Sequence, residues 1–136
     1  MAALFLLEIH TPTRLFYSDS IEAIVLTLID GEVAVYANHS LITAPVTPCL
    51  VKIKDKTGKW KTAFTAEGIL QVGDFRTILL SDAAEWPQEI DYERAKAAKR
   101  RAEEILTEGM LKFEKESAAG ALQRANMRIK VRDEGC

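Results

Sequence analysis

The residues best suited to chemistry are three arginines in the last third of the chain. Arg94 falls near the start of one predicted helix, while Arg124 and Arg128 stand about one turn apart late in a second. In an antiparallel helical hairpin the start of the first helix lies beside the end of the second, so the three guanidinium groups can converge. Guanidinium groups bind phosphate through charge-assisted, bidentate hydrogen bonds. Spacing alone leaves two interpretations open, a phosphate site and three independent surface charges.

Other kinds of chemistry find little support. The sequence contains neither a GxxxxGK[ST] loop nor a GxGxxG motif. His10 and His39 lie far apart without a cluster of metal ligands, and no nucleophile motif accompanies His39. Cys49 and Cys136 form no metal-ligand pattern, and nothing favours a secreted disulfide scaffold. We therefore expect no catalytic residues, no metal site and no required cofactor.

A basic cluster in the first predicted helix raises another hypothesis, nucleic-acid binding. The cluster comprises Lys96, Lys99, Arg100 and Arg101. Glutamates surround it, a pattern typical of a solvated helix face with ion pairs between successive turns. Tyr92 is the only aromatic residue on that helix, so a platform for stacking bases is missing. We interpret the cluster as a solvated face and expect no nucleic-acid partner.

The last third of the chain has helical periodicity. Asp91 is a favourable N-cap for the first predicted helix. Small and apolar residues then recur at steps of three or four, at Ala95, Ala98, Ala102, Ile105 and Gly109, and again at Ala118, Leu122, Ala125 and Ile129. Two such runs joined by a short link predict an antiparallel two-helix hairpin. Burial of apolar surface stabilises by about 25 cal/mol per Å², and alanine side chains bury little of it. We therefore expect the hairpin to depend on another surface and to be mobile without one.

The preceding segment consists of short alternating apolar runs separated by turn signals. Turns are predicted at Asp30-Gly31, in the DKTG segment from Asp55 to Gly58, and at Gly73-Asp74. Short strands with a turn about every ten residues are typical of an antiparallel sandwich or barrel. The predicted fold class is therefore α+β and mainly β, with an N-terminal antiparallel β-sandwich followed by the C-terminal helical hairpin.

Charge marks the division between the two parts. The chain has 136 residues, 48% of them hydrophobic, and a formal net charge of −2. Charged residues number 16 in positions 1–84 and 22 in the shorter stretch 85–136, which predicts domains with those bounds. The N-terminal apolar run is too short for a signal peptide, and no stretch approaches the roughly 20 apolar residues that span a bilayer. We expect a cytosolic chain, or one attached to a membrane only through a partner.

Four segments also follow, in order, the pattern of a known family. "DGEVAVYANHSLITA" (Asp30–Ala44) is similar to a segment written G-E-x-G-V-x-P-G-H-x-P-L-L-T-A, and "AEGILQV" resembles a strand G-G-x-L-E-V. "AAEWPQEIDYERAKAAKRRAEEIL" contains an [IL]-D-x-x-R-A motif carried by Ile90, Asp91, Arg94 and Ala95, and "ALQRANMRIKV" matches the end of a second helix. Over essentially its whole length the chain resembles the epsilon subunit of bacterial F-type rotary ATP synthases, whose mitochondrial equivalent is called delta.

The resemblance implies a ten-stranded β-sandwich, a two-helix hairpin and a non-catalytic role at the foot of the central stalk. There such a subunit binds the gamma subunit and the membrane c-ring, beside the alpha and beta subunits, and couples ion flow to ATP synthesis. Its hairpin extends along gamma to inhibit ATP hydrolysis. The complex lies on the cytoplasmic face of the bacterial inner membrane, so the subunit is peripheral and meets the membrane only through the complex.

The resemblance also implies site residues. In some bacterial members the folded hairpin binds ATP as a regulatory ligand. The positions of this chain that match that nucleotide site are Glu85, Ile90, Asp91, Arg94, Arg124 and Arg128. Glu32 and His39 match sandwich loops that face the stalk and ring, although Ala37-Asn38-His39 stands where the family usually has Pro-Gly-His. The alternative function is a stand-alone interaction module, a sandwich plus hairpin that binds nucleotide or nucleic acid by itself.

Overall fold

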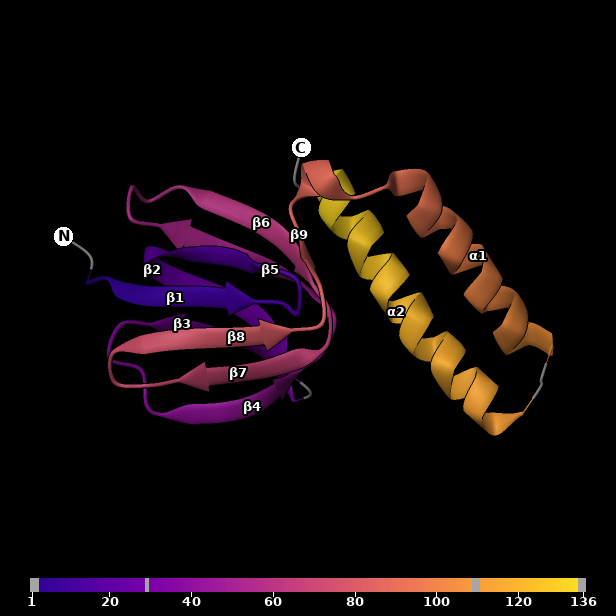
Figure 1. Ribbon diagram of the computed structural model, residues 1–136, viewed down its shortest axis with the longest axis horizontal. Helices are drawn as coiled ribbons and strands as arrows, with labels where there is room; N and C mark the ends of the chain where they lie inside the picture. Colours follow the sequence, from indigo (N-terminus) through magenta and orange to yellow (C-terminus); the bar gives the residue numbers. More distant parts are fainter. Residues whose placement is uncertain (1–2, 29, 109–110, 135–136) are drawn as a thin grey trace.

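The strands form a β-sandwich, and the two C-terminal helices lie together at one side of it (Figure 1). The computed structural model describes residues 3–28, 30–108 and 111–134. The strands are β1 (Phe5–His10), β2 (Leu15–Leu28), β3 (Gly31–Tyr36), β4 (Ile42–Val46), β5 (Cys49–Asp55), β6 (Trp60–Thr65), β7 (Gly68–Val72), β8 (Arg76–Ser81) and β9 (Ala84–Glu85). A 3-10 turn, η1 (Pro87–Glu89), leads to helices α1 (Tyr92–Glu108) and α2 (Lys112–Glu134).

The long strand β2 belongs to both layers of the sandwich. One layer runs β3–β2–β5–β6–β9, and the other runs β1–β8–β7–β4. The first half of β2 pairs with β1, and its last residue, Leu28, pairs with Val46 of β4. The described residues contain nine strands, not the implied ten. The pairings are antiparallel as expected, except that β1 and β8 are parallel.

The three predicted turns are confirmed as hairpins. Asp30-Gly31 joins β2 to β3, and Gly73-Asp74 joins β7 to β8. In the third, between β5 and β6, Gly58 has a φ of 85°, a conformation that side chains on Cβ disfavour. Asp55 stabilises this turn, because its Oδ1 accepts hydrogen bonds from the backbone N–H groups of Thr57 at 2.9 Å and Lys59 at 3.0 Å. Local turn chemistry therefore sets the register of these hairpins.

Alternation along β5 and β6 separates two apolar clusters. Val51 and Ile53 are fully buried between the layers, in the main core. Leu50 and Phe64 are cross-strand partners on the opposite, outer face, where α2 covers them with Met127 and Val131. The outer face of this layer is therefore the surface on which the hairpin rests.

The predicted hairpin is confirmed, and α2 lies between the sandwich and α1 (Figure 1). Asp91 caps α1 as predicted, because its Oδ1 accepts a hydrogen bond from the Arg94 N–H at 3.1 Å. The seam is formed by the predicted alanines, of which Ala95, Ala102, Ala118 and Ala125 are buried. The predicted seam residue Gly109 lies outside the described residues.

The contact of α2 with the sandwich was not predicted. Val131 is fully buried against Phe64, yet it belongs to neither alanine run. A helix covered on two sides has apolar residues around much of its circumference, which obscures a single stripe. The hairpin rests on the sandwich of the same chain, whereas its dependence on an outside surface stays a prediction.

Candidate functional site: a charged pocket between the hairpin and the junction

A pocket opens where α1, α2 and the junction at residues 85–91 meet. Its cavity volume is about 450 Å³. Its charged wall residues are Arg94, Arg101, Arg124, Arg128, Glu85, Glu89 and Asp91. Alanines of the seam form the rest of the wall, and their small side chains leave the space between the helices open. Four arginines against three carboxylates leave the pocket wall with a net positive charge, which favours an anion over a cation.

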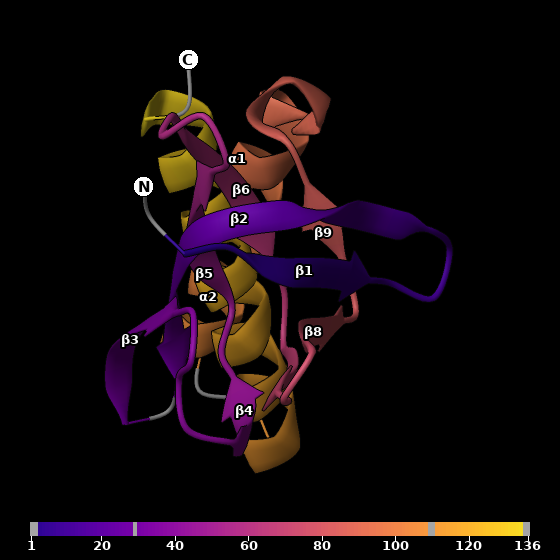
Figure 2. The ribbon, with the colours of Figure 1, turned by 90° about the vertical axis from the view of Figure 1, so that its left-hand side faces the viewer.

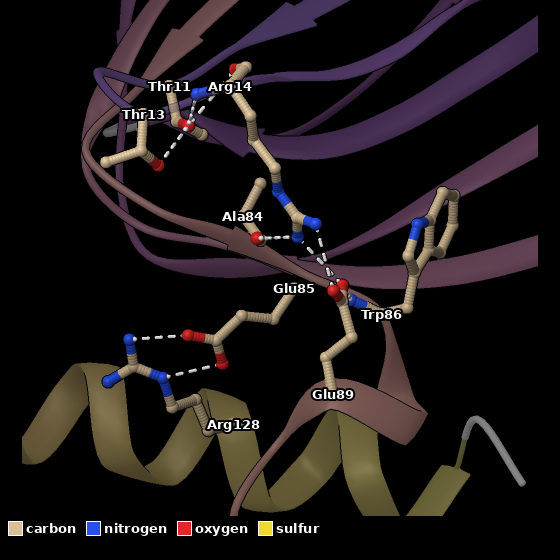
Figure 3. A network of polar contacts seen from close by, with 8 residues as sticks. All are labelled: Thr11, Thr13, Arg14, Ala84, Glu85, Trp86, Glu89 and Arg128. Carbon is tan, nitrogen blue, oxygen red and sulfur yellow. Dashed lines mark hydrogen bonds and ion pairs between the residues drawn. The ribbon is translucent and has the colours of Figure 1, made fainter.

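Arg128 is the most firmly held of these arginines. Its Nε and Nη2 donate to the two oxygens of Glu85 at 3.0 and 3.1 Å (Figure 3). The guanidinium also lies over the Phe64 ring, 4.5 Å from the ring centroid. The bidentate pair and the cation–π contact together join α2 to β9 and β6.

Arg124, one turn earlier on α2, has a different partner. Its Nη1 donates to Oε2 of Glu67 at 2.6 Å. Glu67 lies in the connection between β6 and β7, and it is not part of the pocket wall. Arg124 and Arg128 thus both bind carboxylates on the sandwich side, which anchors α2 there.

Arg94 and Arg101 carry the uncompensated charge of the pocket. Among the residues that the structure describes, neither guanidinium makes an ion pair. They lie seven positions apart, about two turns of α1, with Ala98 between them on the same face. The pocket therefore offers two free guanidinium groups to an incoming anion.

The junction itself is fixed by a residue far away in sequence. Arg14, in the turn between β1 and β2, donates from Nη1 and Nη2 to Glu89 at 2.9 and 2.8 Å, and from Nη2 to the Ala84 carbonyl at 3.1 Å (Figure 3). Glu89 also accepts the Trp86 N–H at 2.9 Å. These bonds to the carboxylate, the Arg14 bond first, lower the pKa of Glu89. Trp86 stacks on Phe16 with centroids 4.5 Å apart, so the junction is part of the sandwich.

The pocket brings together five of the six residues that match the nucleotide site: Glu85, Asp91, Arg94, Arg124 and Arg128. Ile90 lies apart from them, buried in the apolar cluster with Phe64 and Val131. The predicted convergence of the three arginines is thus present, whereas their role in nucleotide binding stays a prediction.

Sequence analysis missed three residues of this region. Arg101 was interpreted as part of a solvated face, although its spacing from Arg94 places the two on one side of the helix. Glu89 was not singled out, although a Glu two residues after Pro87 is a common helix-start signal. Glu67 gave no local signal, because its partner Arg124 lies 57 positions away.

The two predicted interface residues lie at opposite ends of β3. Glu32 is the exposed second residue of the strand, and His39 lies three positions after its last residue, Tyr36. His39 Nδ1 donates to the Ser40 carbonyl at 2.8 Å, in a turn where Asn38 has a φ of 65°. His39 and Phe75, the latter 92% exposed, line a small depression. Phe75 belongs to the loop between β7 and β8, which lies at the end of the sandwich away from the helices in Figure 1, the side that faces the viewer in Figure 2.

Metal sites, cysteines and membrane-spanning helices were also considered in the sequence. No group of three or more potential metal ligands occurs in residues 3–28, 30–108 and 111–134. Cys49 is a buried free thiol whose pKa is raised by burial, while Cys136 lies outside the described residues. Within the same ranges, no helix is both long and apolar enough to cross a bilayer.

The fold and the pocket define a class of protein: a β-sandwich scaffold that carries a helical hairpin on one face. Residues 4–87 match the family model described as the beta-sandwich domain of the ATP synthase Delta/Epsilon chain, and residues 88–132 match its long alpha-helix domain. The chain belongs to the ATP synthase delta/epsilon chain family. Membership confirms the expected non-catalytic subunit of ATP synthase.

The sequence is similar to those of curated relatives over nearly the whole length of both chains. An ATP synthase epsilon chain of Caldicellulosiruptor bescii is 45% identical over 130 residues, covering 96% of this chain and 94% of the relative. The epsilon chain of Caldanaerobacter subterraneus subsp. tengcongensis is 42% identical, covering 93% and 92%. The fold also resembles a chain in the Euglena gracilis mitochondrial ATP synthase, with a TM-score of 0.80 at 19% identity, covering 93% of this chain and 79% of that one.

Proposed function

We propose that the chain is a rotor subunit of the central stalk, bound to the gamma subunit and the c-ring, whose hairpin regulates ATP hydrolysis. One observation carries the proposal: α2 rests on the sandwich through a small apolar cluster and two arginine–carboxylate pairs. Partly exposed ion pairs contribute little net free energy, and the alanine seam adds little apolar area. Such a hairpin can leave its surface and bind another.

The sandwich has two exposed surfaces suited to partners. At the end away from the helices, Tyr36, Leu41 and Phe75 are 58%, 66% and 92% exposed, beside His39. Ile69 and Leu80, cross-strand neighbours on β7 and β8, are each 48% exposed. We assign the first surface to the c-ring and the second to gamma. This placement puts the subunit at the membrane periphery on the cytoplasmic face of a bacterial inner membrane, through the complex alone.

The pocket is proposed to bind ATP as a regulatory ligand. Its walls come from α1, α2 and the junction, so an anion held there links all three. A ligand that binds only the folded arrangement shifts the population toward it. ATP would then oppose extension of the hairpin and thereby relieve inhibition.

Reconstitution with an ATPase complex of alpha, beta and gamma subunits tests the rotor role. We compare the full chain with a chain that ends at Glu89, which keeps the contacts of Trp86 and Glu89 with the sandwich. Both are expected to bind, and only the full chain is expected to inhibit hydrolysis. Failure of both to bind contradicts the proposal, and the alternative of a stand-alone nucleotide-binding module is then favoured if the isolated chain still binds ATP.

A further inference from the structure

Arg124 lies between the pocket and the carboxylate of Glu67. It lines the pocket together with Arg128, and its Nη1 donates to Glu67 at 2.6 Å. Because Glu67 is not part of the pocket wall, the carboxylate reaches the guanidinium from the sandwich side. A phosphate in the pocket would approach the same cation from the other side.

We propose that Glu67 is an internal competitor for Arg124 and thereby sets the affinity of the pocket for polyphosphate. The inference rests on the proposed function, in which the pocket binds a nucleoside triphosphate. Glu67 partly neutralises the charge of Arg124 and holds its Nη1 toward the sandwich, away from the pocket. The ligand must therefore displace the hydrogen bond between Arg124 and Glu67 or share the guanidinium with it.

The backbone presents Glu67 at a fixed place. Its carbonyl accepts the Asp82 N–H at 3.0 Å. The next residue, Gly68, lies so close to β8 that an added Cβ would overlap the carbonyl oxygen of Leu80. The corner between β6 and β7 therefore cannot move away from α2 without breaking the pairing of β7 with β8.

The helix side leaves the guanidinium room to change partners. Gly120 lies one turn before Arg124, and an added Cβ there would stand 3.4 Å from Arg124 Nη1. The side chains of Arg124 and Glu67 are 34% and 44% exposed, so water screens the pair. Arg128 is held by two hydrogen bonds and the Phe64 ring. Of the two α2 arginines that line the pocket, Arg124 is thus the one that can change its partner.

Removing the carboxylate charge should strengthen binding of an anionic ligand. A charge a few ångströms from the guanidinium cancels part of its attraction for phosphate, and the effect grows with the charge of the ligand. If Glu67 instead only orients Arg124 for the ligand, its removal should weaken binding. The two roles therefore predict changes of opposite sign in the affinity for ATP when the Glu67 charge is removed.

The test is a calorimetric titration of the full chain with ATP, ADP and AMP at constant ionic strength. Glu67→Gln keeps the side-chain size and should bind ATP about three- to tenfold more tightly than the unsubstituted chain. The gain should decrease from ATP to AMP and with added salt. Asp82→Asn is the matched control, because it removes one charge at the same corner, and among the described residues the Asp82 side chain has no hydrogen bond or ion pair. It should change the affinity less than about twofold.

A double-mutant cycle shows whether the effect acts through Arg124. In an Arg124→Ala background, Glu67→Gln should have no more effect than Asp82→Asn. If the unsubstituted chain binds ATP and Glu67→Gln leaves the affinity unchanged or lowers it, or if the gain persists without Arg124, the inference is wrong and the ATP site stands. If neither the unsubstituted chain nor any variant binds ATP, the proposed site is wrong, and the competitor role is rejected with it.

Discussion

Arg14 and Glu89 lie 75 positions apart in the sequence, and their side chains form a bidentate ion pair at 2.8 and 2.9 Å. The pair ties the β1–β2 turn to η1, immediately before the hairpin (Figure 3). Since Trp86 also stacks on Phe16 of β2, the chain is attached to the sandwich as far as Glu89. Separation of the hairpin must therefore begin beyond Glu89, at Ile90 and Asp91.

The pair should make folding sensitive to acid. The pKa of Glu89 in the folded state is lowered, first by the hydrogen bond from Arg14. The ionised Glu89 therefore stabilises the fold at pH values above the pKa it has in the unfolded chain, and this stabilisation is lost as the pH falls through the folded-state pKa. Glu89→Gln should lower the free energy of unfolding at pH 7 by about 0.5–1 kcal/mol, because the pair is partly exposed. The difference from the unsubstituted chain should shrink toward pH 3, roughly the range of carboxyl titration. Urea unfolding at both pH values measures it, and an undiminished difference at low pH would contradict the charge argument.

Two glycines should respond to alanine with opposite signs. Gly68→Ala forces a Cβ onto the Leu80 carbonyl, and we expect destabilisation by about 3 kcal/mol or more, since backbone cannot yield as a side chain does. Gly120 lies inside α2, and an added Cβ would meet only the far end of the Arg124 side chain, at 3.4 Å, so Gly120→Ala should stabilise by up to about 1 kcal/mol. Thermal unfolding of the two variants measures both. Equal effects would show that the close approach at Gly68 is not decisive.

Features governed by neighbouring residues could be predicted from the sequence. Asp30-Gly31 and Gly73-Asp74 favour tight turns between apolar runs, and Asp91 caps the helix that follows it. Both kinds of prediction were confirmed. The alanine steps identified the helix seam because helical periodicity depends on nearby residues alone.

Features that depend on distant partners could not be predicted. The parallel pairing of β1 with β8, the burial of Val131 and the Arg14–Glu89 pair each join segments far apart in the chain. Ile90 shows the same limit within one motif, because its neighbour Asp91 lines the pocket while Ile90 itself is buried under α2. The position of a side chain relative to a remote surface is decided by packing, which no local pattern records.

Val131 should control how firmly the hairpin rests on the sandwich. It is fully buried against Phe64. Val131→Ala removes two buried methyl groups, and we expect this to lower the free energy of unfolding by about 1–3 kcal/mol. Hydrogen exchange should accelerate in α1 and α2 while β1, β2 and β5 stay protected, because the main core is a separate cluster. Leu111→Ala, at a residue 62% exposed, should leave exchange unchanged. Uniform acceleration throughout the chain would mean that the two parts do not separate.

The two α1 arginines that line the pocket distinguish a defined anion site from a general basic surface. Arg94, Arg100 and Arg101 are all exposed. Arg94 and Arg101 line the pocket, whereas Arg100, adjacent to Arg101, is not part of its wall. Replacing either wall arginine by alanine should weaken ATP binding about ten- to hundredfold, since a charge-assisted hydrogen bond contributes about 1.5–3 kcal/mol.

Arg100→Ala removes the same charge from the next position, and it should change the affinity by less than about twofold at physiological salt, where exposed charges more than roughly 8 Å apart are screened. Calorimetric titration of the three variants gives the comparison. A nonspecific basic surface would lose affinity equally in all three, because only net charge would matter. Equal losses would therefore reject the pocket between the helices as the site where nucleotide is held.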